Sequence, residues 1–166
     1  LLHSPPVAED WLAFLTAIRQ KCFLSGQVRE LAIMRIAVLN GADYEFRAHT
    51  PLALTEGFTP QQIDALQKGQ TESFNEVERS VLAYTDAMTQ EVRVSDAVFQ
   101  AGKVHFNERE MVELTATIGA YNLMSRFLRP CRSITNRPHQ GQFLKQQGDK
   151  DEDKKSVGFC CGSCRW

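Results

Sequence analysis

The sequence has no long hydrophobic run and no large excess of charge of either sign. No apolar stretch approaches the roughly 20 residues that a membrane-spanning helix requires, because charged side chains such as Arg35 interrupt the richest one. The 19 Lys and Arg residues nearly balance the 20 Asp and Glu residues, which leaves no overall basic field of the kind that attracts nucleic acid. We therefore predict neither a membrane protein nor a nucleic-acid-binding protein.

The N-terminus and the cysteines carry no mark of a secreted protein. No basic segment followed by an apolar one stands at the start, so no signal peptide is visible. The chain opens with Leu1 rather than Met, as expected of a chain whose N-terminus is incomplete. The five cysteines are an odd number and are badly spaced for a disulfide framework, with Cys160, Cys161 and Cys164 crowded at the end. These features favour a reduced, cytoplasmic protein.

Several common catalytic motifs are also missing. The sequence contains no glycine-rich phosphate loop, no HExxH zinc motif and no GxSxG nucleophile elbow. The C-terminal cysteines supply one CxxC unit, whereas zinc sites of this type pair two such units to reach four ligands. We therefore expect no metal site.

Apolar residues at helical spacing dominate the first 130 residues, and the total of 166 residues suits one domain. No stretch alternates apolar and polar residues for long enough to indicate a strand, so we predict an all-α domain of six or seven helices over residues 1–130. The expected helices cover 11–24, 27–40 and 44–56 and then begin after Thr59, Asn75, Ser95 and Asn107.

Two further features of this arrangement are expected from local sequence. Asp43 is the expected N-cap of the third helix, and Pro130 the expected end of the last one. The helix over 27–40 is apolar around most of its circumference, which predicts a central, buried position.

Residues 131–166 are basic and rich in Gln, Lys, Asp and Gly. We expect a disordered tail there, because this segment cannot bury enough apolar surface to offset its ordering entropy.

Glu45 and His49 are the polar pair that draws attention, since their i,i+4 spacing places them on one helical face. A carboxylate beside an imidazole orients the ring and selects its tautomer, which is how a general acid/base is prepared for proton transfer. Glu30 lies near the start of the apolar second helix and faces either a polar cavity or the rim. The alternative interpretation is a solvated surface pair with no chemical role.

A family resemblance extends over about residues 10–130. It rests on the stretch RELAIMRIAVLNGADYEFRAHTPLALTEGF, on YTDAMT and VSDAVF, and on the late segment EREMVELTATIGAYNLMSRFL. In these segments the sequence resembles the carboxymuconolactone decarboxylase-like family, which includes the alkylhydroperoxidase-D type proteins. The resemblance implies an alkylhydroperoxidase-D-like helical fold, a homo-oligomer (a trimer or a hexamer), and activity without a cofactor or metal.

The peroxidase branch of that family carries a Glu, a Cys-x-x-Cys pair and a His. The Glu matches Glu30 and the His matches His49, but Ala42 and Glu45 occupy the two cysteine positions. Without a thiolate at either place, no nucleophile is available there to attack a peroxide and no partner to resolve the product. The resemblance therefore argues against peroxidase activity.

The decarboxylase-like branch keeps a pattern similar to Tyr44-Glu45-x-x-x-His49, which is present here. By this resemblance His49 is the expected general acid/base, oriented by Glu45 or Glu30. The candidate substrate-binding residues are Tyr44, Arg47, Asn122 and Arg126. The alternatives are surface ion pairs for the two arginines and helix packing for Asn122, which follows Tyr121 in the last helix.

These observations predict a cofactor-independent lyase of the decarboxylase type, or an isomerase, that acts by acid/base chemistry on a small organic acid, lactone or related metabolite. Two alternatives stay open. One is a thiol-dependent, peroxiredoxin-like antioxidant of the same superfamily that uses Cys22 or the tail cysteines. The other is a non-catalytic oligomeric protein that binds a small ligand.

Overall fold

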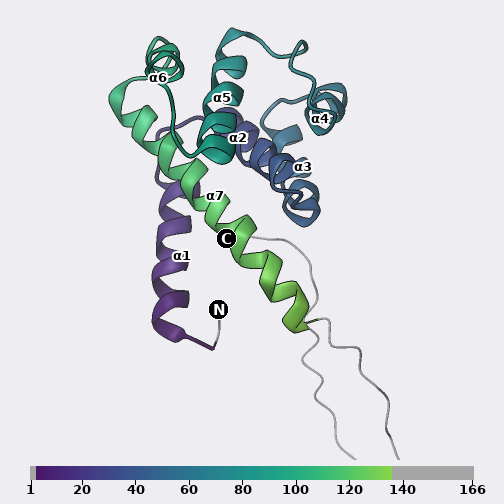
Figure 1. The fold of residues 1–166 in the computed structure, drawn as a ribbon, viewed down its shortest axis with the longest axis vertical. Helices are drawn as coiled ribbons and strands as arrows, with labels where there is room; N and C mark the ends of the chain where they lie inside the picture. The colour runs from purple at the N-terminus through teal and green to yellow at the C-terminus, as the bar shows by residue number, and fades with distance from the viewer. Residues whose placement is uncertain (1–2, 136–166) are drawn as a thin grey trace, which may run out of the picture.

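The computed structural model describes residues 3–135, and the side chains of residues 3–128. In this part of the chain all regular structure is helical, which confirms the predicted all-α class with its six or seven helices (Figure 1). The elements are α1 (Pro5–Gln20), α2 (Gly26–Leu39), α3 (Asp43–Thr55), α4 (Pro60–Gln67), α5 (Glu76–Asp86), the π-helix η1 (Ala87–Glu91), α6 (Asp96–Lys103) and α7 (Glu108–Thr135).

Capping residues fix the starts of the later helices as predicted. The Thr59 side chain accepts a hydrogen bond from the Gln62 backbone amide, and the Thr59 amide donates one to Oε1 of Gln62, so α4 begins with a capping box. Asn75 does the same at the start of α5 with Glu78. Ser95 caps α6 through its side chain. These contacts satisfy amide groups that the first helical turn leaves without a partner.

Three predicted boundaries are wrong. The N-cap of α3 is Ala42 and not Asp43, because the Ala42 carbonyl already accepts the amide of Phe46 at 3.1 Å and Asp43 falls inside the first turn. The first helix covers Pro5–Gln20 rather than 11–24, since prolines are tolerated in the first turn, where amide donors have no partner.

The last helix passes through Pro130 and ends at Thr135, so it exceeds its predicted end. A proline inside a helix removes one hydrogen bond and crowds the preceding turn, yet Pro51 lies inside α3 in the same way. Residues 136–166, which make up most of the predicted tail, lie outside the described part of the chain.

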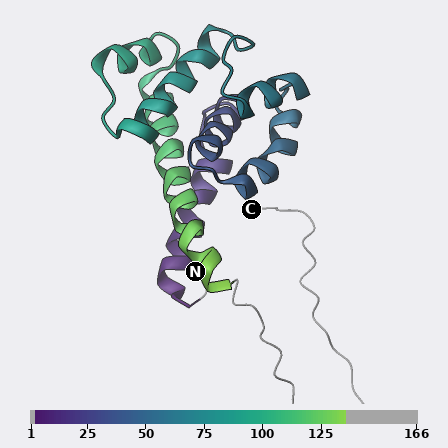
Figure 2. The ribbon, with the colours of Figure 1, turned by 45° about the vertical axis from the view of Figure 1, so that its right-hand side comes forward.

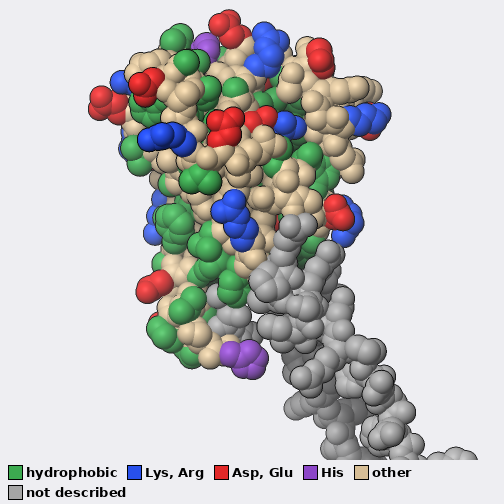
Figure 3. Space-filling view, viewed as in Figure 1, with side chains coloured by type: hydrophobic (Ala, Val, Ile, Leu, Met, Phe, Trp, Pro, Cys, Tyr) green, Lys and Arg blue, Asp and Glu red, His purple; other side chains and the backbone are tan. Residues whose placement is uncertain are grey.

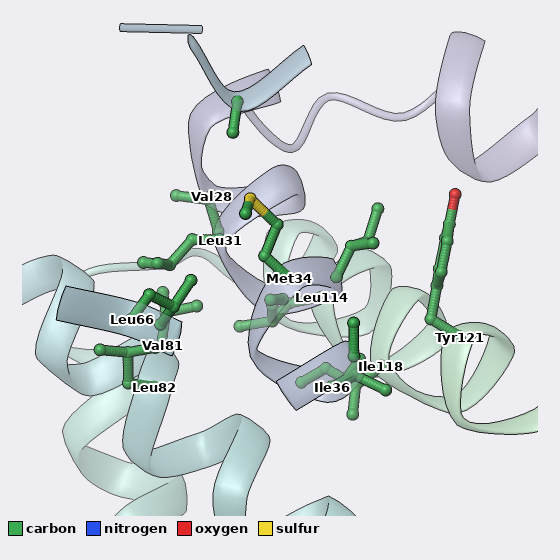
Figure 4. Close-up of a cluster of buried hydrophobic side chains, with 14 of the residues drawn as sticks. Val28, Leu31, Met34, Ile36, Leu66, Val81, Leu82, Leu114, Ile118 and Tyr121 are labelled. Carbon is green, nitrogen blue, oxygen red and sulfur yellow. The ribbon is translucent and has the colours of Figure 1, made fainter. Parts of the chain in front are cut away.

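Helix α2 forms the centre of the domain and packs against α3, α5 and α7. Its side chains Leu31, Ile33, Met34 and Ile36 are no more than 1% exposed, which confirms the central position expected for this helix. Figure 4 shows Met34 and Ile36 among Leu114 and Ile118 of α7 and Leu82 of α5. Burial of each such side chain stabilises the fold by about 1.5–3 kcal/mol.

A bidentate ion pair between α2 and α5 orients these two helices relative to each other. Arg35 of α2 donates to Asp86 at the end of α5, with Nε–Oδ1 at 2.6 Å and Nη2–Oδ2 at 2.7 Å. The planar guanidinium matches the carboxylate in one orientation only, so the pair fixes how α5 lies on α2.

Helices α1 and α7 lie side by side and extend away from the cluster of α2 to α6 (Figures 1 and 2). The rings of Trp11 and Phe127 are 5.1 Å apart across this pair. Apolar side chains remain on the outer surface there (Figure 3), among them Val7, Phe14 and Leu123, each about half exposed. No helix within residues 3–135 is both long enough and apolar enough to cross a membrane.

Candidate functional site

The connection between α2 and α3 brings Glu30 and His49 together. Gly41 has φ 60°, a left-handed conformation that glycine adopts without strain, and it reverses the chain in a very short turn. The amide of Ala42 donates to the carbonyl of Ala37 at 2.8 Å and closes the end of α2. Helix α3 therefore runs back along α2, and its residue 49 faces residue 30.

Two carboxylates flank the imidazole of His49. Its Nδ1 lies 2.6 Å from Oε2 of Glu30, and its Nε2 lies 3.7 Å from Oε2 of Glu45. All three residues are buried, with exposed fractions of 2% for Glu30, 4% for His49 and 7% for Glu45. A solvated surface pair, the alternative considered from the sequence, does not describe this cluster.

The short contact assigns roles to the two ring nitrogens. An ionised carboxylate can only accept a hydrogen bond, so an ionised Glu30 requires the proton on Nδ1. Nε2 is then the nitrogen that can take up or release a proton. Its neighbour Glu45 is more than hydrogen-bond distance away at 3.7 Å, which leaves Nε2 without a strong partner in the cluster.

Burial changes the acidity of two groups around the imidazole. Burial raises the pKa of the Glu45 carboxyl, and the charges of His49 and Arg19 offset part of that rise. Burial also raises the pKa of Tyr121 to about 12, and the nearby carboxylates add to the rise while Arg19 opposes it. The phenol of Tyr121 therefore keeps its proton at neutral pH.

Arg19 and Tyr121 are part of this site, although sequence reasoning did not place them there. The ring of Tyr121 stands edge-on to the His49 ring, with centroids 5.3 Å apart at 86°. Arg19 reaches over from α1, and its Nη1 donates to the Tyr121 hydroxyl at 3.1 Å. These two residues are 102 positions apart in sequence, and no local motif signals their contact.

The predicted substrate-binding residues lie elsewhere or have other partners. Arg47 and Arg126 are exposed, and no hydrogen bond or ion pair joins either to the cluster among residues 3–128. Tyr44 is 53% exposed in the first turn of α3. Asn122 is buried, accepts from Asn40 at 2.9 Å and donates to Thr89 of η1 at 2.9 Å. The substrate roles of these four residues stay predictions.

The described side chains offer little for thiol chemistry at this site. Ala42, which the resemblance aligns with one cysteine of the peroxidase branch, packs against the hydrophobic core. Cys22 lies in the connection between α1 and α2, where burial and the negative Glu113 raise the pKa of its thiol. A raised thiol pKa lowers the fraction of thiolate, the form that attacks peroxides.

These features describe a helical protein with a buried Glu–His–Glu cluster between the antiparallel helices α2 and α3. The model of the Carboxymuconolactone decarboxylase family matches residues 5–87, and the chain belongs to this family. The match covers Arg19, Glu30, Glu45 and His49 but not Tyr121. No curated protein matches the chain.

Two solved structures resemble the domain. One is a protein of unknown function from Agrobacterium tumefaciens, suggested to be the antioxidant defence protein AhpD. It is 25% identical with a TM-score of 0.72, over 79% of this chain and 91% of that one. The other is an uncharacterized peroxidase-related protein from Silicibacter sp. TM1040, 18% identical with a TM-score of 0.69, over 76% of this chain and 69% of that one. The second likeness concerns the fold alone.

Proposed function

We propose that this protein is a cofactor-independent lyase or isomerase that moves protons on a small organic acid, lactone or related metabolite. The observation that carries the proposal is the buried imidazole of His49 between two carboxylates, with Nδ1 2.6 Å from Glu30 and Nε2 3.7 Å from Glu45. Ionisable groups held away from water in this way cost stability, and they are concentrated at sites of proton transfer.

In the proposed reaction Nε2 of His49 takes a proton from an acidic C–H bond next to a carbonyl group of the substrate. The electron pair left behind moves into a neighbouring carbonyl group as an enolate, and the negative Glu30 stabilises the imidazolium that forms. Return of a proton to another carbon completes an isomerisation. Loss of CO₂ from a carboxylate carried on the carbon adjacent to the carbonyl, as in a β-keto acid, leaves the electron pair of the broken bond in the same type of enolate, and the enolate carbon then takes a proton from His49 or Glu45.

The raised pKa of Glu45 supports its role as the second proton carrier. A carboxyl whose pKa is raised holds its proton closer to neutral pH and can deliver it during turnover. Its position one helical turn before His49 allows both groups to face one substrate.

The experiment is a screen of small carboxylic acids and lactones for turnover by the wild-type protein, followed by His49→Gln on any substrate found. We expect His49→Gln to reduce turnover by about 10²–10⁴-fold, the usual contribution of general acid/base catalysis. His105→Gln is the matched control, since His105 lies in the turn that follows α6 and outside the cluster. Full activity of His49→Gln would contradict the proposal.

A thiol-dependent peroxidase is the second candidate, and the AhpD suggestion for the Agrobacterium relative favours it. Peroxide consumption with a dithiol reductant, compared between the wild type and a variant with all five cysteines changed to serine, separates the two. Cysteine-dependent turnover would replace the acid/base proposal with this one. We expect none, because Ala42 and Glu45 stand where that chemistry requires thiols.

We also infer that the protein forms a homo-oligomer, a trimer or a hexamer. The apolar side chains left on the outer surface of α1 and α7 support this inference, and they line a pocket of about 410 Å³ together with Trp11. Light scattering after size-exclusion chromatography tests it. Phe14→Glu, which adds a charge to this surface, is expected to yield smaller species, and a monomeric wild type would contradict the inference.

A further inference from the structure

Arg19 brings a positive charge to the edge of the candidate site. It is half-buried on α1, and its one hydrogen bond within the described part of the chain goes to the neutral hydroxyl of Tyr121. No carboxylate among the described residues lies within ion-pair distance of it. A guanidinium has five N–H donors in a planar fork, so most of the donors of Arg19 remain for a ligand or water.

Tyr121 presents a second donor beside this guanidinium. Its hydroxyl oxygen accepts from Arg19 at 3.1 Å, so its own O–H remains a donor for a further acceptor. The phenol stays protonated at neutral pH, as described above. Figure 4 shows Tyr121 at the edge of the core cluster, with its hydroxyl pointing away from Ile118. The Tyr121 ring lies perpendicular to the His49 ring with centroids 5.3 Å apart, so this phenol belongs to the surroundings of the imidazole.

The charges of the cluster permit an anion here. Glu30 is hydrogen-bonded to His49 at 2.6 Å, and Arg19 acts on Glu45 only at longer range, where its positive charge lowers the pKa of that carboxyl. Arg19 therefore has no direct ion-pair partner among the described residues in its half-buried place, where a charge interacts with an arriving anion more strongly than in bulk water. An anion with two acceptor oxygens matches a phenol O–H and a guanidinium N–H that lie side by side.

We propose that Arg19 and Tyr121 form a carboxylate-binding subsite that holds a carboxylate-bearing small molecule next to His49. This inference rests on the proposed acid/base function, and it narrows the substrate to compounds that carry a carboxylate. One carboxylate oxygen accepts from the guanidinium of Arg19 and the other accepts from the hydroxyl of Tyr121. The anchored group then sets which bond of the molecule faces Nε2.

Binding of succinate to the whole protein, measured by isothermal titration calorimetry, tests the subsite without any need for turnover. Succinamide serves as the neutral probe of similar size. We expect the wild type to bind succinate and not succinamide. We expect Arg19→Gln to raise the succinate Kd by about tenfold or more and Tyr121→Phe by several-fold, as loss of a hydrogen bond to a charged group implies.

Arg93→Gln is the matched control, because it removes the same charge from an exposed position between η1 and α6. Its succinate Kd is expected to equal that of the wild type. The proposal is overturned if the wild type fails to bind succinate, if Arg19→Gln binds it as the wild type does, or if Arg93→Gln weakens binding equally.

Two further variants separate binding from folding. Arg19→Lys keeps the charge without the planar fork, and we expect a smaller rise in Kd than for Arg19→Gln. Circular dichroism melts identify any variant that has lost its fold. If Arg19→Gln is unfolded, the succinate Kd values of Arg19→Lys and Tyr121→Phe test the subsite instead, and wild-type values for both would overturn it. Arg19-dependent binding together with full activity of His49→Gln would reject the acid/base function alone. Lost activity of His49→Gln with unchanged binding by Arg19→Gln would reject the subsite alone.

Discussion

Replacement of Glu30 separates the chemical and structural parts of the Glu30–His49 contact. Glu30→Gln keeps the size of the side chain and an oxygen that can accept from Nδ1, but it removes the negative charge that lies 2.6 Å from the ring. Hydrogen bonds to charged groups contribute about 1.5–3 kcal/mol and neutral ones about 0.5–1.5 kcal/mol, so the imidazolium formed during proton transfer loses about 1–2 kcal/mol of stabilisation. This corresponds to a fall in kcat of about five- to thirtyfold.

Although kcat falls, the free energy of unfolding of Glu30→Gln should be equal to or higher than that of the wild type. Glu30 is 2% exposed, and removing a buried charge relieves a desolvation penalty. Glu30→Leu is the contrasting variant, because it has a similar volume but leaves the Nδ1–H group buried without an acceptor. That loss costs about 1–3 kcal/mol of the free energy of unfolding, a drop in Tm of several degrees.

Turnover of the substrate found in the screen and thermal unfolding by circular dichroism are the two assays. The expected pattern is a slow but stable Glu30→Gln and a slow, less stable Glu30→Leu. A Glu30→Leu variant with wild-type kcat and wild-type Tm would refute the reasoning, since neither the charge nor the acceptor would then matter to His49.

Three further outcomes follow from the structure. The pKa of Glu45 is raised in the folded state, so the protonated carboxyl contributes stability at low pH, and this contribution is lost as the pH rises above about 4.5. Urea unfolding at pH 4 and pH 7 should therefore show that the wild type loses more stability over this interval than Glu45→Gln does. Gly41→Ala should lower the free energy of unfolding by about 1 kcal/mol, because alanine is strained at φ 60°. By contrast Gly119→Ala, in open space on α7, should be neutral or stabilising in the same urea titration. Asn122→Ala should lower the free energy of unfolding by about 2–4 kcal/mol, because it removes buried hydrogen bonds to Asn40, Thr89 and the Ile118 carbonyl. An unchanged midpoint of urea unfolding would show that these hydrogen bonds do not stabilise the fold.

Local signals in the sequence were sufficient to predict the helical architecture. Thr59 and Asn75 predict helix starts because their caps involve residues three positions away, and the structure confirms both capping boxes. The apolar circumference of the second helix predicts its central burial for a similar reason, since it depends on the residues of that helix alone. Asp43 was assigned wrongly because Gly41 joins α2 to α3 so tightly that Ala42 becomes the cap.

Contacts across the fold could not be predicted from such signals. The spacing of Glu45 and His49 placed them on one helical face, but it could not decide between a solvated pair and a buried one. That decision comes from the packing of α3 on α2, which places Glu30 against Nδ1. The contact between Arg19 and Tyr121 joins the first and last helices, and nothing within a helical turn of either residue indicates it.

By the family resemblance, Ala42 and Glu45 occupy the two positions where the peroxidase branch carries cysteines, which implies a different set of chemical groups at this site. A thiol pair exchanges electrons as well as protons, whereas Ala42 offers neither and Glu45 offers a proton alone. The carboxyl of Glu45 lies on the same helical face as His49, at 3.7 Å from Nε2, in surroundings that raise its pKa. A cluster of Glu30, Glu45 and His49 contains groups that can take up and release protons. The acid/base proposal therefore needs only the groups that the cluster contains, whereas the peroxidase alternative needs a thiol brought from outside it.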